Sequence, residues 1–186
     1  GPYAGREIAF LCSGFGNGSS DTRLRVYDVT NKSNMFELDN VAYPNRRFCH
    51  QGWLSEDRKY FYVNDELDEG DVVSTTTMHI FNVEDPANIF YVRAWSSGNS
   101  SRDHNLYVKG DYIYAACGSL LRVLDVSNPA APVITASVSS DAYHIAVTPS
   151  RAYVGSLNSQ VRSYNLADPA HPTFAAPVLS GGGQIS

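Results

Sequence analysis

The segment Leu121-Arg122-Val123-Leu124-Asp125-Val126 has three relatives elsewhere in this 186-residue chain. They are Leu24-Arg25-Val26-Tyr27-Asp28-Val29, His79-Ile80-Phe81-Asn82-Val83 and Val161-Arg162-Ser163-Tyr164-Asn165-Leu166. An Asp or Asn therefore recurs at positions 28, 82, 125 and 165, at steps of 54, 43 and 40 residues. Self-similarity at a period of about 20–50 residues is typical of repeat architectures.

Each repeat unit reads as four short strands. In the third unit, apolar runs at 106–108, 112–116, 120–126 and 133–138 are separated by turn signals such as Gly110-Asp111 and Asn128-Pro129. No stretch keeps a helical period, so helix should be nearly absent. Four strands in about 40 residues predict an all-β β-propeller of four-stranded antiparallel blades. The four visible blades are expected at about 5–45, 48–97, 102–140 and 142–180.

The first unit lacks its innermost strand. The stretch from Val178 to Ile185 aligns with Val138 to Ile145 at an offset of 40, so residues 181–186 are expected to begin a new inner strand. Two arrangements stay open. This strand closes a four-bladed ring within a single domain of residues 1–186, or the chain is a piece of a longer ring of five to eight blades. An ending at the start of a strand favours the longer ring.

Composition and charge exclude some classes of function. Hydrophobic residues make up 43% and aromatic residues 12%, which suits a sizeable β-rich core. The net charge of −5 arises from five acids in residues 64–71, because acids and bases balance elsewhere. Without a basic stripe, nucleic-acid binding is not expected. No apolar run approaches the roughly 18 residues of a membrane span.

Three segments together resemble a known family. They are Cys49 to Asp57, Asn64 to Glu69 and Asp103 to Val108, and the run Leu121 to Pro129 matches the repeat itself. The chain resembles the LVIVD-repeat proteins, in particular the choice-of-anchor B group of surface proteins, over about residues 22–170. The resemblance implies a propeller displayed outside the cell with no well-established enzymatic activity. An anchor segment is missing from this sequence, so the mode of attachment is open.

Three histidines are expected at one end of the propeller channel. His50, His104 and His144 each open a first strand, and Asp103 precedes one of them. The loop after a second strand should lie on the same face, which brings residues 64–71 close to the imidazoles. One interpretation is structural, with each imidazole bonded to the Asp at the end of a third strand. The alternatives are a transition-metal site and catalysis by a histidine with Asp103 or a loop carboxylate.

The acidic loop has two interpretations. A solvated hairpin tip is the plainer one. The other is a calcium site, since Ca²⁺ prefers oxygen ligands. Its ligands would come from Asp65, Glu66, Asp68, Glu69 and Asp71.

The sequons favour a secreted protein. Three N-glycosylation sequons begin at Asn17, Asn31 and Asn99, in polar stretches that should be exposed. Three cysteines fit either one disulfide with a free thiol or three buried thiols, and Cys49 is expected to pair with Cys12 or Cys117 if a disulfide forms. Cys49 and the adjacent His50 should point to opposite faces of a strand, which excludes a nucleophilic pair.

Two functions follow from these observations. The favoured one is a secreted or cell-surface structural and interaction module, which binds a protein or glycan partner or forms a homo-oligomer within an extracellular assembly. The alternative is a metal-dependent, lactonase-like hydrolase at the channel mouth. Converging imidazoles at an open mouth would favour the enzyme, and buried imidazoles bonded to backbone or Asp would favour the scaffold. Trp53 and Trp95 are expected in the core.

Overall fold

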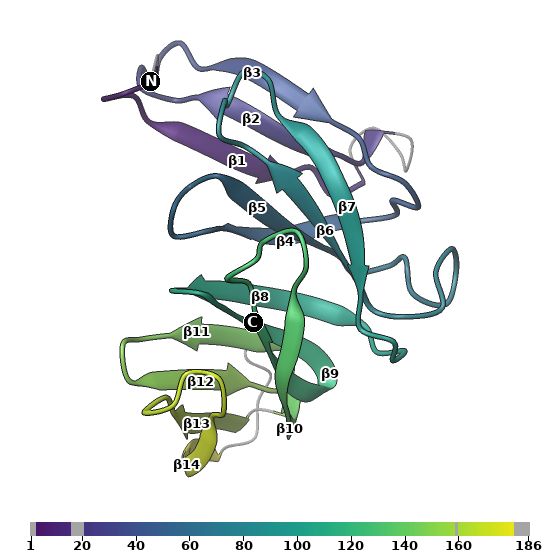
Figure 1. Cartoon of the computed structure of the whole chain (residues 1–186), viewed down its shortest axis with the longest axis vertical. Helices are drawn as coiled ribbons and strands as arrows, with labels where there is room; N and C mark the ends of the chain where they lie inside the picture. Colours follow the sequence, from purple (N-terminus) through teal and green to yellow (C-terminus); the bar gives the residue numbers. More distant parts are fainter. Residues whose placement is uncertain (1–2, 16–20, 159, 181–186) are drawn as a thin grey trace.

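The computed structural model describes residues 3–15, 21–158 and 160–180, and these form four antiparallel sheets stacked side by side (Figure 1). The described residues include no α-helix, and hence none that is long and apolar enough to cross a membrane. The predicted all-β propeller with four visible blades is confirmed.

The strands follow the chain from sheet to sheet. The first sheet contains β1 (Ile8–Cys12), β2 (Leu24–Asp28) and β3 (Phe36–Val41). The second contains β4 (Cys49–Leu54), β5 (Tyr60–Asp65), β6 (Thr77–Asn82) and β7 (Phe90–Ser96). The third contains β8 (Asp103–Lys109), β9 (Tyr112–Asp125) and β10 (Val133–Ala142). The fourth contains β11 (His144–Val147), β12 (Arg151–Gly155), β13 (Gln160–Asn165) and β14 (Thr173–Ser180).

Strand β9 provides two strands of the third sheet. Its first half, up to Cys117, pairs with β8, and its second half, from Gly118, pairs with β10. Gly118 has a φ of 60°, a left-handed conformation that glycine adopts without a steric penalty. The third sheet therefore has the same four passes as the second and fourth sheets.

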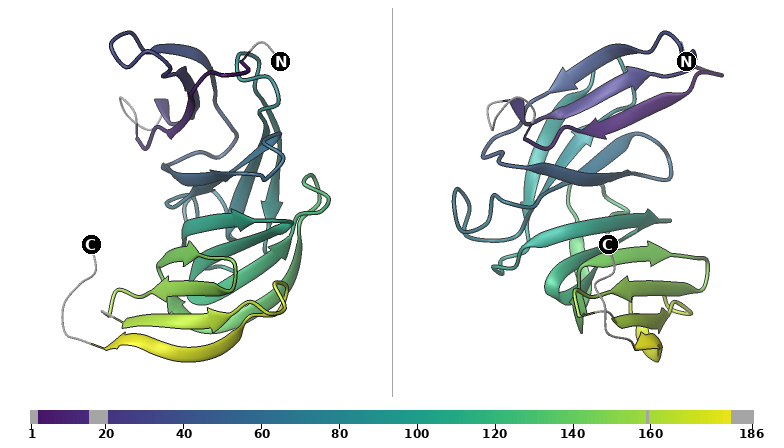
Figure 2. Two further views of the ribbon diagram at one scale, coloured as in Figure 1. Left: turned by 90° about the vertical axis from the view of Figure 1, so that its left-hand side faces the viewer. Right: turned by 180° about the vertical axis from the view of Figure 1, so that it is seen from behind.

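Within the described residues, the first sheet has no innermost strand, as predicted. Strand β1 lies beside β4, just as the second strands β5 and β9 lie beside the next inner strands β8 and β11. The first and fourth sheets lie at opposite ends of an arc (Figures 1 and 2). Residues 181–186 lie outside the described residues, so the choice between a closed ring and a longer ring stays a prediction.

The repeated Asp or Asn closes the turn after each third strand. Its side-chain oxygen accepts a hydrogen bond from the backbone N–H two residues later, which is an Asx turn. The pairs are Asp28 with Thr30 at 2.9 Å, Asn82 with Glu84 at 3.1 Å, Asp125 with Ser127 at 2.8 Å and Asn165 with Ala167 at 3.0 Å. The predicted bond from a channel histidine to these residues is wrong, because the histidines contact Glu66, Asn105 and the Tyr143 backbone oxygen instead.

Apolar residues fill the three spaces between neighbouring sheets. Strand alternation gives the second and third sheets two buried faces, so Val63 packs toward the first sheet while Tyr62 packs toward the third. The third and fourth sheets enclose a similar cluster around Leu121 and Tyr164. Because these clusters fill the spaces between neighbouring sheets, the inner strands β4, β8 and β11 keep fixed positions beside one another.

Candidate functional site at the channel face

The inner strands bring three imidazoles together where β4, β8 and β11 begin. His50 is the second residue of β4, His104 is the second residue of β8, and His144 begins β11. The ring centroids of His50 and His104 are 4.2 Å apart, and those of His104 and His144 are 5.3 Å apart with the rings perpendicular. The structure thus places the three predicted histidines together.

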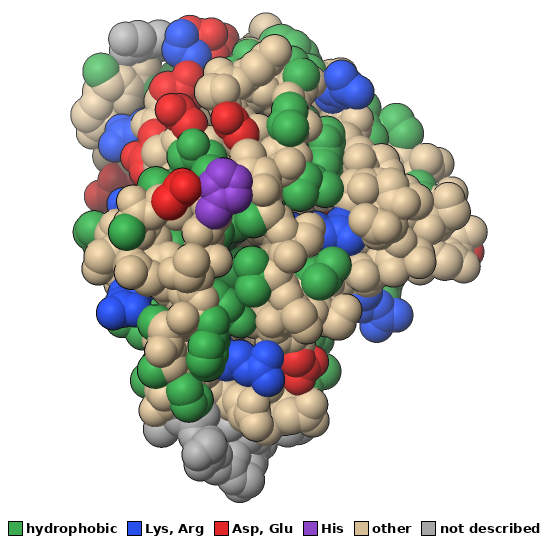
Figure 3. All heavy atoms as spheres, turned by 60° about the horizontal axis from the view of Figure 1, so that its bottom comes forward, with side chains coloured by type: hydrophobic (Ala, Val, Ile, Leu, Met, Phe, Trp, Pro, Cys, Tyr) green, Lys and Arg blue, Asp and Glu red, His purple; other side chains and the backbone are tan. Residues whose placement is uncertain are grey.

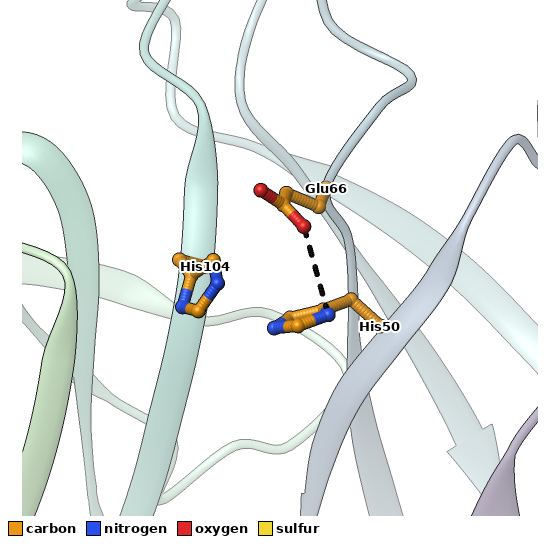
Figure 4. Close-up of side chains that lie close together, drawn as sticks. All are labelled: His50, Glu66 and His104. Atoms are coloured by element: carbon orange, nitrogen blue, oxygen red, sulfur yellow. Dashed lines mark ion pairs between the residues drawn. The ribbon is translucent and has the colours of Figure 1, made fainter. Parts of the chain in front are cut away.

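A carboxylate from the acidic loop completes the cluster. Glu66 follows β5 and turns toward His50, with 3.6 Å between its Oε2 and the Nδ1 of His50 (Figure 4). This distance is too long for a direct hydrogen bond. One ligand atom from each of His50, Glu66 and His104 lies within 4.8 Å of the other two. A single ion coordinated by all three would need such a separation.

Neighbouring groups orient the His104 ring. Its Nδ1 lies 3.1 Å from the backbone oxygen of Tyr143 and 2.6 Å from Oδ1 of Asn105. Both partners are acceptors, so Nδ1 carries the proton and the Nε2 lone pair is available to a ligand. The Tyr143 ring stacks on His104 with 3.6 Å between centroids, and Nδ1 of His144 lies 3.2 Å from the same Asn105 oxygen.

Two of the three imidazoles have lowered pKa values. Burial lowers the pKa of His50 below its usual value, and the neighbouring His104 lowers it further, although Glu66 opposes the shift. Burial and His104 also lower the pKa of His144. A neutral imidazole is the form that coordinates a metal.

The acidic loop is not a solvated tip, so that interpretation is wrong. Asp65 and Asp68 are fully buried. The Asp65 carboxylate accepts hydrogen bonds from the Tyr43 hydroxyl and from the backbone N–H groups of Arg47 and Phe48. Asp71 is exposed and pairs with the Arg47 guanidinium at 2.6 Å. The five predicted calcium ligands therefore do not converge on one point.

Two loop acids meet a third from the next sheet. Glu69 interacts with Asp68 on one side and with the buried Asp103 of β8 on the other. Burial raises the pKa of both Asp68 and Glu69 to about 8, with repulsion from Asp65 adding to the shift of Asp68 and repulsion from Asp68 adding to the shift of Glu69. The pKa of Asp103 is also raised well above its usual value, first by burial and then by Glu69 and Asp68. Asp103 thus faces the loop acids.

The sequence interpretation missed three residues of this region. His79 is buried, and its Nε2 lies 3.7 Å from Oδ2 of Asp68. Its neighbours at positions 78, 80 and 81 are apolar, and a histidine within such a run was the feature of the sequence that could have revealed it. Asn105 and Tyr143 are each adjacent in sequence to a predicted histidine, but no pattern marked them as partners of that site.

The predicted disulfide of Cys49 with Cys12 or Cys117 is not formed, because all three cysteines are free thiols. Cys12 and Cys49 are neighbours between the first and second sheets, where contact with Cys49 and burial raise the pKa of Cys12. Cys117 lies between the second and third sheets, on the far side of the second sheet from Cys49. The thiols pack as small apolar groups.

The exposure of the sequons and of the two tryptophans agrees in part with the expectations from the sequence. Asn31 and Asn99 are exposed, whereas Asn17 lies outside the described residues. Trp95 packs in the core and donates its indole N–H to the Pro132 oxygen, but Trp53 is 38% exposed and stacks on Tyr107. Figure 3 shows one face of the molecule, where acidic side chains gather on one side around a histidine.

Residues 102–140, which make up the third sheet, match the LVIVD repeat family model. No curated protein sequence matches the chain. The resemblance to the choice-of-anchor B group stays a prediction.

Three solved structures share the fold. A protein of unknown function from Desulfotomaculum acetoxidans is 13% identical with a TM-score of 0.70, covering 93% of this chain and 57% of that one. A protein from Lactobacillus plantarum is 14% identical with a TM-score of 0.75, covering 96% and 54%. A candidate 6-phosphogluconolactonase from Bacteroides uniformis is 14% identical with a TM-score of 0.74, covering 95% and 55%. The chain spans just over half the length of each, and such identities show the fold alone.

Proposed function

We propose that this LVIVD-repeat β-propeller binds a divalent transition-metal ion at His50, Glu66 and His104 and uses it to hydrolyse a small ester or lactone. The observation that carries the proposal is the convergence of three ligand atoms within 4.8 Å of one another. They come from β4, β8 and the loop after β5, so two sheets must assemble before the site exists.

The ligand set matches known catalytic chemistry. Two imidazoles and one carboxylate hold zinc in hydrolases that leave a fourth position open to water, and the same set binds iron(II). A bound metal of this kind polarises a carbonyl oxygen and lowers the pKa of its water. The lowered pKa of His50 favours its metal-binding form, and the His104 ring is oriented with its Nε2 free for such a metal.

His144 is placed to move protons. Its Nδ1 faces Asn105, and its ring lies edge-on to His104. In the proposed reaction the water oxygen bonds to the acyl carbon, and the carbon–oxygen ester bond breaks. One water proton passes through His144 to the departing alkoxide oxygen, so that an acid and an alcohol form without any oxidant. A structural neighbour described as a candidate 6-phosphogluconolactonase makes lactones the first substrates to test.

Metal titration of the purified full-length chain tests the proposal. Calorimetry with Zn²⁺, Mn²⁺ and anaerobic Fe²⁺ should find about one ion per chain, and His104→Ala should weaken binding at least about tenfold. His171→Ala is the matched control, because His171 is exposed and bonds only to Asp168 in the described part of the chain. Equal metal affinities of the two variants would overturn the proposed metal site. Metal binding without lactone or ester hydrolysis would overturn the proposed enzymatic activity.

A binding module is the second candidate function. Each outermost strand exposes a large apolar residue near its start: Phe36, Phe90, Val133 and Phe174. Such edges are templates for pairing with a protein partner or a second copy. These exposed edges support an interaction module. Sedimentation of the wild type and of Phe90→Ser would detect self-association through these edges, and a monomer at all concentrations would exclude it.

A further inference from the structure

A second group of carboxylates lies apart from the imidazoles, between the second and third sheets. Asp68 and Glu69 belong to the loop after β5, and Asp103 begins β8. Asp68 and Asp103 are at most 1% exposed, so this is not a solvated acidic patch. Glu69 lies between the other two and is within reach of both.

None of these six carboxylate oxygens accepts an aligned hydrogen bond in the described part of the chain. The Glu69 carboxyl is within hydrogen-bond reach of Asp68 and Asp103, and these carboxyls bond to one another only if a proton is shared. Nearby backbone amides of Asp68, Glu69 and Thr77 act on the Asp68 and Glu69 charges, but they are not aligned for hydrogen bonds. Burying an unpaired carboxylate is strongly unfavourable. Three together require either protons or a cation.

A histidine independent of the loop points at the same group. The His79 side chain of β6 is 1% exposed, and its Nε2 lies 3.7 Å from Oδ2 of Asp68 without a hydrogen-bond partner. This distance is too long for a hydrogen bond, so the imidazole does not satisfy Asp68. The His79 nitrogen and the six carboxylate oxygens thus lie in the same region, without aligned hydrogen-bond partners among the described residues.

The guanidinium of Arg122 is the nearby protein cation. It is 1% exposed, and together with Asp103 it acts on the thiol of Cys117. None of its three nitrogens has a hydrogen-bond partner among the described residues. Arg122 is also absent from the ion pairs within 4.0 Å that those residues make. The acids therefore lack a protein counter-ion in contact with them.

We propose that Asp68, Glu69 and Asp103 hold a calcium ion that joins the acidic loop of the second sheet to the inner strand of the third. Ca²⁺ takes six to eight oxygen ligands at about 2.3–2.6 Å, and the three carboxylates offer six. The site differs from the calcium set expected from the sequence. Asp65 is not a ligand, because its carboxylate accepts hydrogen bonds within the fold. Glu66 faces His50, and Asp71 is exposed. Asp103 joins the proposed ligands in their place.

Thermal unfolding of the full-length chain in calcium and in chelator tests the site. Saturating Ca²⁺ should raise Tm by at least about 5 °C and titrate as about one ion per chain. Asp103→Asn should abolish this shift, whereas Asp71→Asn, an exposed acid of the same loop, should keep it. Far-UV circular dichroism checks that each variant is folded.

Two further variants separate the alternatives. His104→Ala should keep the calcium shift, while Asp103→Asn should keep binding of Zn²⁺, so this site and the imidazole site can fail independently. A wild type with no calcium shift, together with strong destabilisation by Arg122→Met, would show that Arg122 neutralises the acids and would overturn the proposal. A shift lost in His104→Ala but kept in Asp103→Asn would overturn it too.

Discussion

At the scale of single residues, Asp65 ties the end of β5 to the segment that precedes β4. Its oxygens accept bonds from the Tyr43 hydroxyl at 2.9 Å and from the N–H groups of Arg47 at 2.7 Å and Phe48 at 2.6 Å. Asp65→Asn turns an amide toward these donors, and we expect it to lower the free energy of unfolding by about 3 kcal/mol. Urea titration measures the loss. Asp71→Asn, the exposed comparison, should change it by less than about 1 kcal/mol, and equal losses would contradict the assignment.

The carboxyl pairs at the sheet junction predict an unusual pH dependence. The pKa values of Asp68 and Glu69 are raised to about 8 in the folded chain, far above those of the unfolded chain. The folded state therefore binds more protons between about pH 4 and 8, and stability must fall as pH rises through this window. In chelator, we expect a loss of about 1–3 kcal/mol between pH 6.5 and 8. His79 is neutral throughout that range, since its pKa is lowered to about 4.

Denaturant titrations at the two pH values measure this loss. Asp68→Asn should flatten the profile, because it removes one of the shifted acids and relieves the other. Calcium should stabilise the protein more at pH 8 than at pH 6.5, because ionised carboxylates are the ligand form. A stability that rises with pH in chelator would contradict the assignment of raised pKa values.

At the scale of elements, the Asx turn ends each third strand. Asp125 accepts the Ser127 N–H at 2.8 Å and thereby starts the turn toward β10. Asp125→Ala should cost about 1 kcal/mol of stability, whereas Asp125→Asn keeps the acceptor and should stay within about 0.5 kcal/mol of the wild type. Thermal unfolding compares the two variants directly. A similar loss in both would mean that the charge, and not the turn bond, matters.

The strands could be predicted from the sequence because their signals are local. Alternation and turn residues marked 112–116 and 133–138, and the structure extends these to β9 and β10. Burial of the acidic loop could not be predicted, since it depends on Tyr43 and Asp103 from neighbouring sheets. The convergence of His50 and His104 followed from propeller topology, but the choice of Glu66 over the other loop acids depends on side-chain directions that no spacing encodes.

At the scale of the whole molecule, the inner strands are joined by a side chain. Gln51 of β4 donates its Nε2 to the Leu106 oxygen at 3.1 Å and accepts the Leu106 N–H at 2.8 Å. It lies next to His50, and Leu106 is two residues beyond His104. Gln51 therefore sets the spacing between the two imidazoles across the sheet junction.

Replacing this amide should affect the metal site without touching a ligand. We expect Gln51→Leu to keep the fold and to weaken transition-metal binding about tenfold, because the ligand separation is no longer fixed. Calorimetry measures the affinity, and circular dichroism measures the fold. Gln160→Leu, at an exposed position of β13, is the control. An unchanged affinity in Gln51→Leu would show that packing alone holds the imidazoles apart.

The loop between β5 and β6 makes the second unit longer than its relatives, and it supplies Glu66, Asp68 and Glu69. A protein that grows by duplication starts from equivalent copies, so a new activity requires one copy to diverge. An insertion at a hairpin between second and third strands leaves every strand pairing intact. A single insertion or deletion in this loop can therefore add or remove the proposed metal ligands during evolution, while the strand pairing is inherited unchanged.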